Sequence, residues 1–185
     1  MKKGNYSKWV IGAIAALSIS SAASAFELSS GDISEGHHMT KVFEFKGFGC
    51  EGENKSPLLQ WDNAPEGTKS FAVTAYDPDA PTGSGWWHWV VTDIPATVSQ
   101  LVRGAGSEGG ELPKGSRSFV NDFGTADFGG ACPPENHGMH RYQFTVWALP
   151  TEKIGLPEGA SPALVGYMLR AKSLGSTVLT ATYSR

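Results

Sequence analysis

The chain has 185 residues, of which 40% are hydrophobic and 18% charged, and its formal net charge is −3 at pH 7. This length suits one domain. The 23 glycines and 11 prolines favour a turn-rich, mostly β chain over a coiled coil or a disordered polyelectrolyte. So acidic a chain lacks the positive surface that binds nucleic acid or anionic lipid.

The first 25 residues have the pattern of a secretory signal peptide. Three lysines and no acidic residue accompany an apolar run at 9–19, which is too short to span a bilayer of about 30 Å as a helix. Ala23-Ser24-Ala25 is a small-x-small cleavage site, so the mature chain is expected to begin at Phe26. Without those lysines the net charge becomes −6. We expect a periplasmic or secreted protein with no transmembrane anchor after cleavage; an uncleaved anchor is the alternative.

Residues 26–185 are expected to form a single mainly β domain. Alternation of apolar and polar residues predicts strands at 42–45, 71–76, 89–94, 142–149 and 178–183. The inward-facing sets in two of them are Phe71, Val73 and Ala75, and Tyr142, Phe144, Val146 and Ala148. Long loops rich in glycine and proline, at 104–114 and 121–138, separate the strands and are of a length that is usually functional.

One helix is predicted near the C-terminal end. Ser161 can cap it and Pro162 suits its first position. Leu164, Met168 and Ala171 are expected to share one face, and Gly175 lies just beyond its end.

The two cysteines, Cys50 and Cys132, both lie in the expected mature chain. An oxidising compartment favours a disulfide between them, and two separate buried thiols are the alternative. Neither belongs to a C-x-x-C motif, so redox catalysis and a thiolate metal site have little support.

Two loops carry the chemistry. One runs through 77–81 and 86–89 (DPDAP and WWHW), and the other through 129–134 and 137–142 (GGACPP and HGMHRY). Each lies where a predicted strand ends or begins. If the strands are antiparallel neighbours, Asp77, His88 and His140 converge.

Such a pocket suits a small anion. Two imidazoles offer N–H donors and titrate near neutral pH, and Tyr142 adds a hydroxyl. Backbone N–H groups at Gly129 and Gly130 can approach an anion closely because no side chain intervenes. Trp86 and Trp89 supply an apolar wall. Asp77 would orient a histidine or accept a hydrogen bond from a ligand ammonium group.

Simpler interpretations remain open. His88 can be an ordinary buried strand histidine, and Asp77 and Asp79 can be turn formers beside prolines. His137 and His140 stand three residues apart, yet their loop is not evidently helical, so we expect no metal.

Together the DPDAP, W-x-HW, CPP and HRY segments resemble the two signature regions of the phosphatidylethanolamine-binding, or Raf kinase inhibitor-like, family. SPLLQW at 56–61, APEGTKSF at 64–71 and NDFG at 121–124 resemble its bacterial YbhB/YbcL branch, in particular the secreted YbcL type. The resemblance covers about residues 26–183.

The resemblance implies a large antiparallel sheet packed on a smaller one, with helices near the C-terminus, and no shared enzymatic activity. Its anion pocket would use Asp77, His88, Pro134, His140 and Tyr142, with the Gly130 backbone nearby. The chain departs from the pattern at 135–136, where Glu-Asn replaces a small residue and glycine and makes the rim more acidic.

The sequence therefore predicts an exported soluble binding protein for phosphate or a phosphorylated head group, with no cofactor. A protein-interaction or protease-inhibitor module acting outside the cytoplasm is the alternative, and a hydrolase is the weakest. A protein partner and a homodimer through an exposed sheet edge are further possibilities.

Overall fold

The computed structural model describes residue 1 and residues 24–185. The predicted signal peptide lies almost entirely outside the described residues and stays a prediction. In chain order the elements are β1 (Glu27–Ser29), a 3₁₀ helix η1 (Lys41–Phe43), β2 (Lys46–Gly47), β3 (Cys50–Glu51), β4 (Leu59–Asp62), β5 (Ser70–Asp77), β6 (Trp86–Pro95), β7 (Gln100–Leu101), β8 (Arg117–Ser118), β9 (His140–Leu149), α1 (Pro162–Lys172) and β10 (Gly175–Tyr183).

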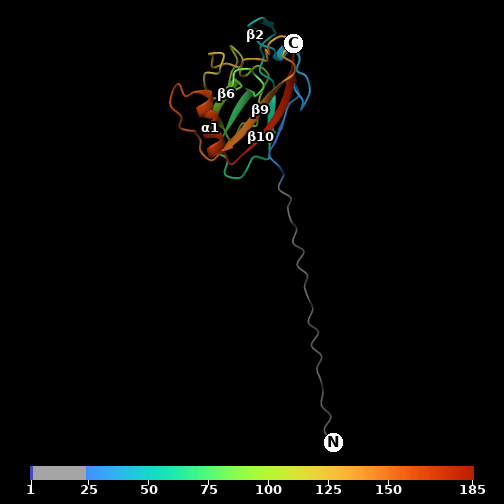
Figure 1. Ribbon diagram of the computed structural model, residues 1–185. Helices are drawn as coiled ribbons and strands as arrows, with labels where there is room; N and C mark the ends of the chain where they lie inside the picture. The colour runs from blue at the N-terminus through green and yellow to red at the C-terminus, as the bar shows by residue number, and fades with distance from the viewer. Residues whose placement is uncertain (2–23) are drawn as a thin grey trace.

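The strands form one large antiparallel sheet and two small ones, which confirms the predicted mainly β fold. The large sheet has the order β10-β9-β5-β6-β8, and the smaller ones are β1-β4-β7 and the β2–β3 hairpin. All pairings between these strands are antiparallel. Figure 1 shows β6, β9 and β10 crossing the body of the molecule with α1 beside them.

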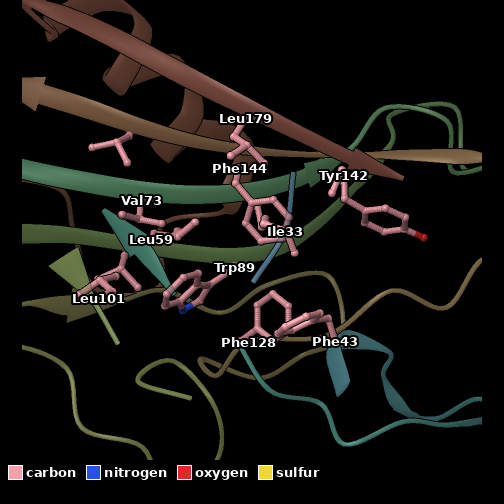
Figure 2. Packing of buried hydrophobic residues seen from close by; sticks show 14 of the residues in the cluster. Ile33, Phe43, Leu59, Val73, Trp89, Leu101, Phe128, Tyr142, Phe144 and Leu179 are labelled. Atoms are coloured by element: carbon pink, nitrogen blue, oxygen red, sulfur yellow. The ribbon is translucent and has the colours of Figure 1, made fainter. Parts of the chain in front are cut away.

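The main hydrophobic core lies between the large sheet and the three-stranded sheet. Val73, Trp89 and Phe144 come from the large sheet and meet Leu59 and Leu101 from the small one, as Figure 2 shows. The alternating residues predicted to face inward on β5 and β9 all belong to this cluster. The binary pattern of these two strands therefore fixed their orientation correctly.

Helix α1 covers the opposite face of the large sheet. The Ser161 side chain accepts a hydrogen bond from the Leu164 backbone N–H at 3.2 Å and Pro162 begins the helix, as predicted. The helix buries Val165, Gly166 and Leu169, and of the three residues predicted to share a face Met168 is partly buried against the same cluster.

A glycine brings α1 close to the sheet. Gly166 allows the helix to approach Trp87 so closely that a Cβ atom there would lie 2.6 Å from the indole ring. A glycine contributes nothing to an apolar pattern, so this close approach could not be predicted from the sequence. Gly175 does not end the helix but begins β10, and Ser173 is the C-cap.

The predicted strand at 42–45 is also wrong. Residues 41–43 form η1, held by local bonds from Phe43 N–H to the Thr40 carbonyl and from Glu44 N–H to the Lys41 carbonyl. A four-residue alternation is too short to separate a strand from a turn.

Cys50 and Cys132 form a disulfide with a Cα–Cα distance of 6.0 Å. The bridge joins the β2–β3 hairpin to the loop before β9. The prediction that the two cysteines pair is therefore confirmed.

Strand β10 is one edge of the large sheet, and residues 36–39 cover part of it. Backbone bonds run from Met39 N–H to the Thr182 carbonyl at 2.8 Å and from Gly36 N–H to the Thr180 carbonyl at 2.7 Å. The homodimer through a sheet edge stays a prediction. Within the described residues, no helix is both long and apolar enough to cross a membrane.

Candidate functional site

The site forms where β5 ends and β9 begins. These strands are antiparallel neighbours, paired from Ser70 opposite Leu149 to Tyr76 opposite Gln143. Asp77 ends β5 and His140 opens β9. The predicted meeting of the two is confirmed, with 2.7 Å between His140 Nδ1 and Asp77 Oδ2.

His88 reaches the site because β6 contains a bulge. Ala75 pairs with Trp89, but the next residue, Tyr76, pairs with Trp87, so His88 is the extra residue on β6. A bulge reverses the alternation of side chains along a strand. As a result His88 lines the site beside Trp89, which belongs to the main core, while Trp87 packs against the α1 side of the sheet.

A cavity of about 200 Å³ opens at this end of the main core. Five of the six predicted ligand-binding residues line it, and Gly130 does not. Its lining residues are Phe48, Asp77, Ala80, Pro81, Thr82, Trp86, His88, Phe123, Cys132, Pro133, Pro134, His140 and Tyr142.

His88 has a fixed tautomer. Its Nδ1 lies 2.7 Å from the Gly129 carbonyl and 3.1 Å from the Gly130 carbonyl. A carbonyl only accepts hydrogen bonds, so Nδ1 carries the proton and Nε2 presents a lone pair. Burial lowers the pKa of His88, although the glycine carbonyls and the charge of Asp77 oppose this. The ring is therefore neutral at pH 7.

The two glycines do not offer free N–H groups to an anion, contrary to our expectation. Gly129 N–H donates to the His88 carbonyl at 2.9 Å, and Gly130 N–H donates to Asn54 Oδ1 at 2.7 Å. Their carbonyls instead orient His88. Gly130 also packs closely on the chain at 43–45, where a Cβ atom would lie 2.4 Å from the Phe43 carbonyl oxygen.

Gly130→Ala is therefore expected to destabilise the fold by about 2 kcal/mol, because two backbone segments must separate. Urea unfolding would measure the loss, and the NMR signal of the His88 ring would move. The matched control is Gly31→Ala, whose Cβ would meet only a Leu58 methyl group at 3.5 Å. Equal stability of the two variants would contradict this account.

Asp77 and His140 belong to a hydrogen-bonded chain that reaches the surface. Asp77 Oδ1 accepts from the Asp79 backbone N–H at 2.8 Å, and Oδ2 accepts from His140 Nδ1–H. His140 Nε2 lies 2.7 Å from Nδ1 of the exposed His137, so the two rings share one hydrogen bond. Both Asp77 oxygens are engaged, so the carboxylate orients the histidine, one of the two roles expected for it.

Three residues that line the cavity each carry a buried polar atom with no hydrogen-bond partner among the described residues: Trp86 Nε1, His88 Nε2 and Tyr142 Oη. Burial and the charge of Asp77 raise the pKa of Tyr142, and a backbone contact with Cys132 that falls short of hydrogen-bond geometry lowers it slightly. Tyr142 is thus a neutral hydroxyl. Figure 2 shows it at the end of the core with its oxygen directed away from Phe144.

An unpaired buried polar group is costly, so such atoms call for explanation. Four others occur in the described chain, none of them lining this cavity. The residues that line the cavity thus carry two hydrogen-bond donors and one acceptor that have no partner.

Sequence reasoning misjudged the apolar wall. Trp89 is fully buried in the main core and does not line the cavity, whereas Phe48 and Phe123, which we did not predict, do. Phe123 packs edge-on against Trp86 and His88, with ring centroids 5.4 and 5.3 Å apart. The only signal was an aromatic residue inside each of two glycine-rich loops.

Among the described residues, no group of three or more potential ligands is arranged to hold a metal ion.

Comparisons with known proteins give a consistent picture. Residues 29–184 match the family described as PBP, phosphatidylethanolamine-binding protein. UPF0098 protein YbcL of Escherichia coli K12 is 54% identical over 171 residues, which is 92% of this chain and 93% of the relative. UPF0098 protein YbhB of the same organism is 48% identical over 158 residues, 85% of this chain and 99% of the relative.

The fold matches a solved structure of the same kind. The crystal structure of E. coli YbcL, described as a new member of the mammalian PEBP family, superposes with a TM-score of 0.83 at 55% identity. The match covers 86% of this chain and 98% of that one.

Proposed function

Because this chain belongs to the phosphatidylethanolamine-binding protein family, we propose that it is an exported binding protein whose cavity takes phosphate or a phosphorylated head group. The observation that carries the proposal is the set of three unpaired polar atoms on residues that line one cavity. Trp86 Nε1–H and the Tyr142 hydroxyl can donate, and His88 Nε2 can accept.

This donor–acceptor set complements a singly protonated phosphate. Two of its oxygens would accept from Trp86 and Tyr142, and its hydroxyl would donate to His88 Nε2. The cavity therefore needs no arginine or lysine to take an anion, because the ligand itself carries the proton that the neutral imidazole lacks.

Export is supported by the pattern of the first 25 residues and by the disulfide, a cross-link that persists in oxidising compartments. We therefore propose a periplasmic or secreted location.

Binding is expected to take up one proton. Above a pH of about 7, His88 is neutral and a free phosphate monoester is mostly a dianion, since its second pKa is about 6. The bound state needs one further proton, so the Kd should rise about tenfold per pH unit from pH 7 to 8.5 and level off below pH 6, where the free ligand already carries the proton. Calorimetry with phosphorylethanolamine in buffers of different ionisation enthalpy would measure the uptake.

His88→Phe is the control, because a phenyl ring of similar size offers no lone pair and the uptake should fall toward zero. Sulfate carries no proton at these pH values and should bind more weakly than phosphate. The absence of heat at millimolar phosphorylethanolamine, or a Kd independent of pH, would contradict the proposal.

A further inference from the structure

An aromatic residue occupies the tip of the β2–β3 hairpin under backbone strain. Gly47 pairs with Cys50, so the turn consists of Phe48 and Gly49, whose φ angles are 53° and 82°. A two-residue turn with both φ values positive favours Asn-Gly, and a bulky side chain in that region is rare. The strain is local and points to a function for Phe48.

The side chain of Phe48 is exposed, yet it lies beside two other aromatic rings. It is 72% exposed, yet its ring lies 5.6 Å from Phe45 and 5.9 Å from Phe123, and these two stack at 4.2 Å. Phe48 and Phe123 both line the cavity. The aromatic cluster of Phe45, Phe48 and Phe123 thus continues the cavity wall outward to the surface.

The hairpin is fastened to that wall on two sides. The disulfide ties Cys50, next to the turn, to Cys132, which lines the cavity. Arg185 donates from Nη1 to the Gly49 carbonyl at 2.8 Å and from Nε to the Pro133 carbonyl at 2.7 Å. The disulfide and the two Arg185 hydrogen bonds therefore hold the hairpin, and with it Phe48, at the opening of the cavity.

We propose that the aromatic cluster is a subsite for an apolar substituent of the ligand, so that the protein selects aryl or alkyl phosphates over inorganic phosphate. The proposal rests on the anion site proposed above and adds the chemistry of the group attached to the phosphate. When the phosphate is bound, an apolar substituent that extends out of the cavity would cover exposed aromatic surface and contact the edge or face of the Phe48 ring.

The decisive variant is Phe48→Asn, which removes the ring and places the favoured Asn-Gly pair in the turn. Its thermal stability should equal or exceed that of the parent chain. We expect the preference for phenyl phosphate over inorganic phosphate, measured as a ratio of Kd values, to fall about fivefold. The Kd for inorganic phosphate should change less than twofold, and Phe48→Leu should retain part of the preference.

A neutral probe separates this proposal from the anion site. Benzyl alcohol carries no phosphate, and NMR saturation transfer should detect it on the parent chain and lose it in Phe48→Asn. If no phosphate binds but benzyl alcohol does so through Phe48, the proposed function fails and the subsite stands. An unchanged preference ratio, an equal loss for both phosphates, or no transfer to benzyl alcohol when phosphates also fail to bind, would overturn the subsite.

Discussion

Removing the Cys50–Cys132 disulfide is expected to lower the free energy of unfolding by about 4 kcal/mol. The bridge closes a loop with a sequence separation of 82 residues, and opening it restores the conformational entropy of the unfolded chain. For a chain of this size the midpoint of thermal unfolding should fall by about 10 °C. Urea unfolding with and without a reductant would measure the loss.

The Cys50→Ser, Cys132→Ser double variant separates the bridge from other effects of the reductant. It should match the reduced parent chain and should not respond to the reductant. A loss below about 1 kcal/mol would contradict this entropic account, because it would mean that residual structure already constrains the reduced unfolded chain.

Asp77→Ala is expected to be the most damaging substitution in the cavity, at about 3 kcal/mol. The substitution leaves the Nδ1–H group of the buried His140 without an acceptor, and it also removes the acceptor of the Asp79 backbone N–H. Asp79→Ala is the matched control two residues away. Its partner Arg141 lies in solvent, so the loss should be several-fold smaller.

The Asp79 comparison also has a pH signature. The hydrogen bond from Arg141 lowers the pKa of Asp79, so its contribution is present above the unfolded pKa of about 4 and is lost as the pH falls through the folded value. The difference between Asp79→Ala and the parent chain should therefore be smaller at pH 3 than at pH 7 and should vanish in stronger acid. Urea unfolding at pH 7 and pH 3 tests both substitutions, and equal losses at pH 7 would contradict the assignment of Asp77.

The long strands of the fold could be predicted from the sequence, and the short ones could not. β5, β6, β9 and β10 have eight to ten residues and a clear apolar pattern. β2, β3, β7 and β8 have two residues each, which no periodicity can reveal. Their positions follow from packing.

The site shows the same division. The convergence of Asp77 and His140 was predicted on the condition that their strands are antiparallel neighbours, because the end of one such strand meets the start of the other, and the structure meets this condition. The roles of the glycines did not follow, because a missing side chain admits either a ligand or another stretch of backbone. The bulge at His88 was equally hidden, since it depends on how two strands pair.

His137 does not line the cavity, but its imidazole is hydrogen-bonded to His140, which does. His140 Nε2 can form one hydrogen bond, and His137 is its partner. Any guest that takes this position must release the outer ring into water. A guest that bonds to His140 would therefore be detected at the surface, as a change in the NMR signal of the His137 ring.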